Sequence, residues 1–154
     1  MSKSSVINRT DAATYGLLGD TYSLLAAGPA TNQEIGVVEA VVQPDSGPPP
    51  HVNVREALTW YVIEGELTFY VDGEQHRVTT GGCIYMPANV VHTFKNTGTV
   101  PSRALMISTP GGFEGMFERA GQEVKPGGRA PAPTPDDVQR FMAVAPDYGL
   151  EIRA

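Results

Sequence analysis

Glycine and proline interrupt this sequence too often for most of it to form long helices. The 154 residues include 17 glycines and 13 prolines, and both residue types break regular helices. Between them lie short apolar segments rich in β-branched residues, a composition typical of strands. The segments that we expect to be strands are 22–26, 35–42, 58–63, 67–71, 75–79, 83–86, 90–95 and 103–108. Their number and spacing predict an all-β fold, an antiparallel sandwich or barrel.

Two turn signals support this interpretation. Gly47-Pro48-Pro49-Pro50 cannot lie within a helix or a strand ladder, because three consecutive residues lack a backbone donor. Asp72-Gly73 is a dipeptide typical of the tight turn of a hairpin, and it separates two of the expected strands. The strands are therefore expected to be joined by tight turns and one rigid loop.

The C-terminal part of the chain has a different pattern. We expect a short helix over 113–120, followed by an irregular connector over 126–133 that is rich in proline and glycine. We therefore divide the chain into three parts. These are an N-terminal arm (1–20), a barrel (21–112) and a C-terminal extension of short helices packed on the barrel (113–154).

A second helix is expected to begin at Thr134-Pro135-Asp136-Asp137. This sequence has a hydroxyl cap, a proline in the first turn and acidic residues at the positive helix end. Pro146 ends the helix, and its apolar stripe comprises Val138, Phe141, Met142 and Ala145. We expect the stripe to pack on the outside of the sheet or, as an alternative, to contact a second subunit.

Charge and composition exclude several classes of partner. The chain has 11 Lys and Arg residues against 17 Asp and Glu residues, a formal charge of −6. Nucleic acids and anionic membranes are bound by clustered basic residues, so we expect neither as a partner. A single cysteine, Cys83, excludes an internal disulfide and a thiolate metal cluster. No secretory signal or apolar span of roughly 18 residues is visible, so we expect a cytoplasmic protein.

The three histidines are the first candidates for chemistry. His76 lies between Gln75 and Arg77 near a hairpin, and we expect it to be solvated. His51 follows the proline run, and His92 lies in an apolar strand, where a histidine is more often a hydrogen-bonded core residue than a ligand. Taken singly, none of the three defines a site.

Two longer motifs place His51 and His92 in a common context. Gly47–Asn53, continuing through Trp60–Leu67, resembles the first motif of the cupin superfamily. Gly81–Asn96 resembles the second, with Pro87, His92 and Asn96 at the family's intervals. Within the superfamily the chain is most similar to small single-domain proteins described as quercetin dioxygenase-like. The resemblance implies a double-stranded β-helix, or jelly-roll, barrel that binds a metal through three histidines and one glutamate, and a homodimer.

The chain departs from that metal-binding pattern at two of the four ligand positions. His51 and His92 match the first and third histidines, whereas Asn53 replaces the second and Leu58 replaces the glutamate. Imidazole and carboxylate ligands suit Fe, Mn, Ni, Cu or Zn. A metal at His51, Asn53 and His92 is therefore expected to be weakly held or absent. Glu56 and Glu39 are alternative carboxylates that could replace the missing one.

Strand alternation predicts what surrounds these polar residues. If Leu58 points inward, Trp60 follows it on the same face, and His92 is followed by Phe94. We expect Leu58, Trp60, Phe69 and Phe94 to wall a pocket for a small organic molecule, with His51, Asn53 and His92 as its few polar groups. The alternative is that the apolar residues simply fill a small barrel.

We predict that the protein binds a small organic molecule inside the barrel, and we favour an enzyme over a non-catalytic protein. One version is metal-dependent and resembles the dioxygenases. The other is a metal-free isomerase, cyclase or lyase, in which His51 or His92 acts as general acid or base and Asn53 donates to an oxyanion. A non-catalytic binding module is a further alternative, and a structural or partner-binding role has the least support.

Overall fold

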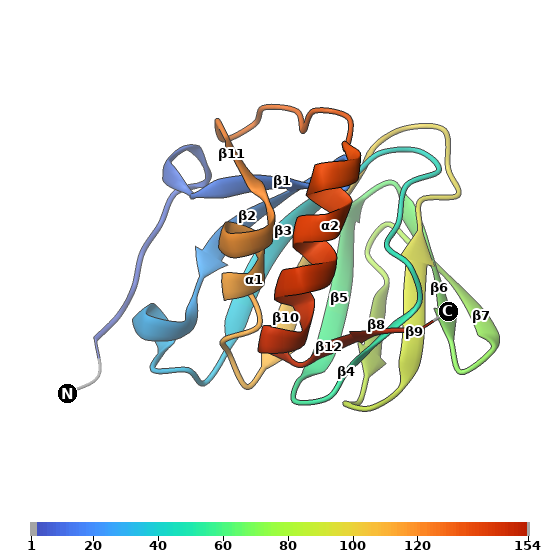
Figure 1. Cartoon of the computed structure of the whole chain (residues 1–154), viewed down its shortest axis with the longest axis horizontal. Coiled ribbons are helices and arrows are strands. Elements are labelled where there is room, and N and C mark those ends of the chain that lie inside the picture. Colours follow the sequence, from blue (N-terminus) through green and yellow to red (C-terminus); the bar gives the residue numbers. More distant parts are fainter. Residues whose placement is uncertain (1–2, 154) are drawn as a thin grey trace.

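The computed structural model describes residues 3–153, and these form two antiparallel sheets that face each other (Figure 1). The seven-stranded sheet has the order β11-β1-β2-β3-β10-β5-β8, and the five-stranded sheet has the order β12-β4-β9-β6-β7. The first comprises β1 (Thr14–Leu17), β2 (Asp20–Ala26), β3 (Gly36–Val42), β5 (Ala57–Glu64), β8 (Cys83–Met86), β10 (Ser102–Thr109) and β11 (Gln122–Val124). The second comprises β4 (His51–Asn53), β6 (Glu66–Val71), β7 (Glu74–Thr79), β9 (Val91–Lys95) and β12 (Leu150–Ile152). The predicted double-stranded β-helix barrel is confirmed.

Each of the expected strands is present, with bounds within two residues of the prediction. Four further strands, β1, β4, β11 and β12, are too short for an alternating pattern to reveal them. Residues 14–17, which were expected to belong to an arm, pair with β2 and β11 as β1. The Asp72-Gly73 turn is confirmed, because both residues have the positive φ angles that a tight hairpin turn requires.

The core lies between the inner faces of the two sheets, as strand alternation predicts. Along β5, Leu58, Trp60 and Val62 are buried, whereas Tyr61 is exposed. The rigid loop before β4 is held close to β9. A Cβ at Gly47 would overlap the carbonyl oxygen of Phe94, so only glycine allows this approach.

The C-terminal extension contains α1 (Gly115–Ala120) and α2 (Pro135–Val144), which pack against each other (Figure 1). The remaining helical turns, η1 (Arg9–Asp11), η2 (Gly28–Thr31) and η3 (Ala145–Tyr148), are short 3-10 segments. Helix α2 begins with the predicted cap: Asp137 N–H donates to the Thr134 hydroxyl, and Thr134 N–H donates to the Asp137 carboxylate. Within residues 3–153, neither helix has the length and hydrophobicity needed to cross a membrane.

The predicted apolar stripe of α2 was wrong in part. Phe141 and Ala145 are buried together with Val144, but Val138 and Met142 are 44% and 45% exposed. The buried face is rotated because α2 packs against α1 and reaches the barrel interior with Phe141, instead of lying on the outside of the sheet.

Candidate functional site

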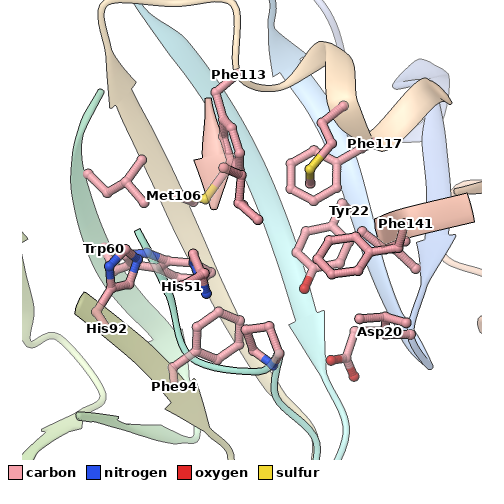
Figure 2. Close-up of a pocket in the computed structure, with 16 residues that line it drawn as sticks. Asp20, Tyr22, His51, Trp60, His92, Phe94, Met106, Phe113, Phe117 and Phe141 are labelled. Atoms are coloured by element: carbon pink, nitrogen blue, oxygen red, sulfur yellow. The ribbon is translucent and has the colours of Figure 1, made fainter. Parts of the chain in front are cut away.

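A cavity opens between the two sheets and beneath the C-terminal helices (Figure 2). Its volume is about 50 Å³, larger than the roughly 10–15 Å³ that one buried water needs. The seven-stranded sheet contributes Leu58 and Trp60, the five-stranded sheet contributes His51 and His92, and α2 contributes Phe141. The cavity is therefore a feature of the whole fold and not of any one motif.

His51 and His92 lie at one end of this cavity, side by side on neighbouring strands. They are direct partners in the antiparallel pairing of β4 with β9. Their ring centroids are 4.3 Å apart, and the ring planes make an angle of 59°. Both residues are buried, with 6% and 4% of their surface exposed. The fold thus brings together two imidazoles that lie 41 residues apart in the sequence, as predicted.

Backbone contacts determine the tautomer of both rings. His51 Nδ1 lies 2.9 Å from the Pro49 carbonyl oxygen, and His92 Nδ1 lies 3.1 Å from the Val90 carbonyl oxygen. A carbonyl oxygen only accepts, so Nδ1 carries the proton in each neutral ring. The Nε2 atom of each ring is then an acceptor, and the cavity holds two acceptors next to each other.

Burial keeps this pair neutral. Desolvation and the nearby His92 lower the pKa of His51 to about 4, against a partial opposite effect of the Pro49 carbonyl. Desolvation also lowers the pKa of His92, but the Val90 carbonyl and the Asp72 carboxylate act in the opposite direction. A charge on His92 opposes protonation of His51, so the two rings titrate as a coupled pair.

Asn53 is buried but does not line the cavity. Its side chain is only 2% exposed, and neither its Nδ2 nor its Oδ1 has a hydrogen-bond partner. Glu56 is also buried outside the cavity lining, with Oε2 unpartnered, and desolvation raises its pKa. Neither residue is part of the cavity lining.

The other candidate carboxylate faces away from the interior. Glu39 accepts hydrogen bonds from Arg9 and Arg103. These two arginines lie on the outer side of the seven-stranded sheet, because Arg103 alternates with the buried Ala104 along β10. Glu39 therefore cannot replace the missing ligand.

The donor set does not fit the four-ligand metal centre that the family resemblance implies. Two positions present imidazole nitrogens, but Asn53 is not in the lining and Leu58 lines the cavity with hydrocarbon. No three His, Cys, Asp or Glu side chains among residues 3–153 are grouped so that they could hold a metal ion. Two neutral imidazoles without an anion form a weak site for a divalent cation.

The predicted aromatic wall is present with one correction. Trp60 and Phe94 line the cavity beside Leu58, with ring centroids 4.8 Å apart. Phe69 does not line it, because Phe69 packs behind both rings, with its centroid 5.6 Å from that of Trp60 and 5.9 Å from that of Phe94. Trp60 Nε1 is buried without a partner. The aromatic residues thus form two layers, and only the inner layer meets the cavity.

The far end of the cavity contains residues that the sequence motifs did not identify. Asp20 and Tyr22 enter it from β2, and Phe113, Phe117 and Phe141 enter it from the C-terminal extension (Figure 2). Alternation within 22–26 offered a weak signal for Tyr22, and Phe141 belonged to the predicted stripe. Nothing local indicated that these segments meet the histidines.

Asp20 is a buried carboxylate with two donors. Gln43 N–H donates to it at 2.9 Å and the Ser46 hydroxyl at 2.7 Å. Desolvation raises its pKa to about 6, although both hydrogen bonds act in the opposite direction. The folded protein therefore holds the Asp20 proton up to about pH 6, whereas the unfolded chain releases it near pH 3.8.

We expect Asp20→Asn to stabilise the protein at neutral and alkaline pH. An asparagine can accept from Gln43 N–H and donate to the Ser46 hydroxyl, so both contacts survive. The raised pKa means that the Asp20 contribution to stability falls between about pH 4 and pH 6. At roughly 1.4 kcal/mol per pKa unit, the variant should gain up to roughly 3 kcal/mol at pH 8 and little at pH 4.

Urea unfolding of both proteins across this pH range measures the effect. The lowered pKa of His51 acts with the opposite sign in the same range, and taking the difference between variant and wild type at each pH cancels it. Asp11→Asn, at an exposed position, is the matched control. A difference that does not depend on pH would contradict the expectation.

The fold and the site together define the class of protein. Two antiparallel sheets form a barrel around a cavity, and two buried histidines on paired strands lie at one end of it. Residues 38–108 match the family described as Cupin domain. Residues 38–108 thus form a cupin domain, and the fold of the described chain is that of solved cupin structures.

Three relatives illustrate the similarity. Quercetin 2,3-dioxygenase of Bacillus subtilis (strain 168) is 28% identical over 71 residues, which cover 46% of this chain and 21% of that protein. KdgF from Halomonas sp. has a TM-score of 0.61 at 18% identity, covering 70% of this chain and 94% of that one. The polyketide cyclase RemF from Streptomyces resistomycificus has a TM-score of 0.61 at 23% identity, covering 70% and 80%. The chain spans between 21% and 59% of the length of the curated relatives it matches, and the structural similarities show a shared fold.

The family match ends before the C-terminal extension. Phe113, Phe117 and Phe141 nevertheless line the cavity, as does Leu150 from β12. The residues that decide the shape of one end of the cavity therefore lie outside the segment shared with the family.

Proposed function

We propose that this protein binds a small, largely apolar organic molecule in the barrel cavity and catalyses proton transfer on it, with the His51–His92 pair as the acid–base group. The observation that carries this proposal is the pair of Nε2 acceptors at one end of an apolar cavity. Isomerisations, cyclisations and eliminations that begin with removal of a proton are reactions of this type.

The arrangement of the pair supports a role as base. Both rings are held by backbone carbonyls, so neither has to reorient when a substrate arrives. Their pKa values are lowered by burial, which keeps both rings unprotonated at neutral pH. His92 is the better base of the two, because the Asp72 carboxylate stabilises its protonated form.

The apolar walls support a small organic substrate. Leu58, Trp60, Phe94 and Met106 surround the space beside the imidazoles. Pockets for small molecules commonly combine such walls with a few convergent polar groups. The names of the similar proteins include a dioxygenase and a cyclase. The donor set of this chain favours proton transfer by its own side chains, because that chemistry requires no metal ligand at Leu58.

We expect His92→Gln to weaken binding of a hydroxylated aromatic probe. The probe is 4-fluorophenol, whose hydroxyl donates to an acceptor and whose fluorine reports binding by ¹⁹F NMR. Glutamine replaces the imidazole nitrogen by a weaker amide acceptor, and weakening this hydrogen bond by about 1–1.5 kcal/mol should raise the dissociation constant about tenfold. The double variant with His51→Gln should bind more weakly still.

Two controls isolate the contribution of the pair. His76→Gln changes a histidine that lies on the exposed strand β7, and it should leave binding unchanged. The probe 4-fluorotoluene, which lacks the hydroxyl, should bind wild type and His92→Gln alike. Equal affinity of wild type and the double variant for 4-fluorophenol would overturn the proposal.

The same variants separate an enzyme from a non-catalytic binding module. Under the proposal, His92→Ala removes the base and should abolish proton exchange between a bound carbon acid and solvent. A binding module would show altered affinity in that variant and no exchange in wild type.

A further inference from the structure

Tyr22 occupies the end of the cavity opposite the histidine pair. Its ring is stacked on Phe117, with centroids 4.2 Å apart and planes at 16°. The residue is only 7% exposed, and it lines the same cavity as His51 and His92. Figure 2 shows its hydroxyl pointing away from Phe117. The stacked ring fixes the position of a polar atom at this end of the cavity.

The hydroxyl of Tyr22 is not used by its polar neighbour. Asp20 lies two residues away on the same face of β2, but its carboxylate accepts from Gln43 N–H and the Ser46 hydroxyl. No other hydrogen bond to the Tyr22 hydroxyl is present among residues 3–153. The hydroxyl is not one of the fully enclosed unpartnered atoms, unlike Trp60 Nε1, so it is open to the cavity and available to a ligand or water.

The chemical environment makes Tyr22 a donor. Burial and the negative charge of Asp20 raise the pKa of Tyr22 well above its ordinary value, so its O–H stays protonated. The cavity thus has a hydrogen-bond donor at one end and two acceptors at the other. Phe94 and Met106 form an apolar wall between these two ends. A complementary ligand has an acceptor oxygen at one end and a removable proton towards the other.

We propose that the Tyr22 hydroxyl binds the acceptor oxygen of the substrate, and that the substrate is therefore a small enolisable ketone or aldehyde. This inference rests on the proposed function, because the histidine pair supplies the base. In the step, a C–H bond next to the carbonyl breaks and its proton passes to His92 Nε2. The electron pair of that bond forms the C=C bond of an enolate, and the carbonyl π electrons move to the oxygen that Tyr22 O–H stabilises. Return of the proton from His92 to carbon completes the cycle without any further reactant.

Asp20 acts here as a positioning residue. It lies beside Tyr22 and binds the loop that carries Gln43 and Ser46. Burial keeps Tyr22 protonated and the Asp20 charge adds to this effect, but the same charge opposes the enolate. Removing the charge while keeping both hydrogen bonds should therefore make enolisation faster.

Acetophenone is a suitable probe, because it has an acceptor oxygen, enolisable methyl protons and no donor. Wild-type protein should exchange these protons with D₂O faster than buffer does, as followed by ¹H NMR. Tyr22→Phe should slow the catalysed exchange by roughly 100-fold or more, the range found when one donor to an oxyanion is removed. Tyr61→Phe, at an exposed position outside the cavity, should leave the rate unchanged. Asp20→Asn should exchange faster than wild type at pH 8.

The carbonyl stretch of bound acetophenone gives a readout that a merely structural role of Tyr22 would not change. A hydrogen bond from Tyr22 lowers this frequency in wild type, and Tyr22→Phe should restore the higher frequency of the free carbonyl. Tyr22→Phe keeps the ring that stacks on Phe117, so the fold is expected to survive, and thermal unfolding checks this.

The outcomes separate this inference from the proposed function. If 4-fluorophenol binding depends on the histidines but the carbonyl frequency is equal in wild type and Tyr22→Phe, the assignment of Tyr22 is wrong and the proposed function stands. Exchange in wild type that is no faster than in buffer, or failure of acetophenone to bind, overturns the substrate class. Loss of the histidine dependence itself overturns the proposed function and this inference together.

Discussion

The double variant Asn53→His/Leu58→Glu is expected to bind Zn²⁺ about 1,000-fold more tightly than wild type. It restores the two ligands that the family pattern contains and this chain lacks. The two existing imidazoles, with centroids 4.3 Å apart, would then be joined by a third imidazole and an anion. An anion matters most, because nothing in the wild-type lining beside the histidines offsets the charge of a divalent cation.

The single variant Leu58→Glu should be less stable than wild type when no metal is present. Leu58 is 3% exposed, and its strand neighbours on either side are Met86 and Ser108. A carboxylate there is buried without a partner, so the single variant should lose stability in the absence of metal. In the double variant, Zn²⁺ at 1,000 times the dissociation constant should return about 4 kcal/mol.

Thermal unfolding with and without Zn²⁺, together with isothermal titration calorimetry, measures both effects. Wild type and Asn53→His alone serve as controls, and both should show a small shift in melting temperature. A double variant whose melting temperature does not respond to Zn²⁺ would show that residues 53 and 58 do not converge with the histidines. The alignment of the motifs with the structure would then be wrong at these positions.

Glu114→Ala is expected to lower the free energy of unfolding by about 4 kcal/mol. Glu114 is 1% exposed and accepts from Gly28 N–H at 2.6 Å, from Gly112 N–H at 2.8 Å and from the Ser108 hydroxyl at 3.4 Å. The variant leaves these buried donors unpaired, and each unpaired donor costs roughly 1–3 kcal/mol. Helix α1 begins at the next residue, so the loss also loosens the segment that carries Phe113 and Phe117 into the cavity.

Urea denaturation measures this loss, and two variants calibrate it. Glu114→Gln keeps one acceptor oxygen and should lose less stability than Glu114→Ala. Glu118→Ala removes an exposed glutamate from the same helix and should change stability by less than about 0.5 kcal/mol. A Glu114→Ala protein as stable as Glu118→Ala would show that the three hydrogen bonds contribute nothing net.

Some features of the cavity follow from local sequence patterns, and others follow only from tertiary packing. Alternation in β5 predicted the inward positions of Leu58 and Trp60, because a strand repeats every two residues whatever its surroundings. The same rule placed Phe69 on an inward face but could not tell that Trp60 and Phe94 stand between it and the cavity. Alternation with a period of two residues predicts which face of a sheet a side chain lies on. Whether that side chain reaches the cavity depends on how the opposite sheet packs against it.

The C-terminal extension illustrates the same limit for helices. The cap at Thr134 was predictable, because a capping box depends only on residues three positions apart. The rotation of α2 was not, and the exposed Val138 and Met142 could equally have been its buried side. The helix buries the side that includes Phe141 because this side chain fits between the barrel and α1.

The amino-acid sequence by itself determined the strand pattern, the turns, the substituted ligand positions and the polarity of the cavity walls, since each depends on residues close together along the chain. Only the tertiary structure decided that the strand of His51 pairs with the strand of His92, and that Tyr22, Asp20 and the C-terminal helices close the other end of the same space. Such pairings join segments far apart in the chain. They are selected by the packing free energy of the complete barrel, which no short segment determines alone.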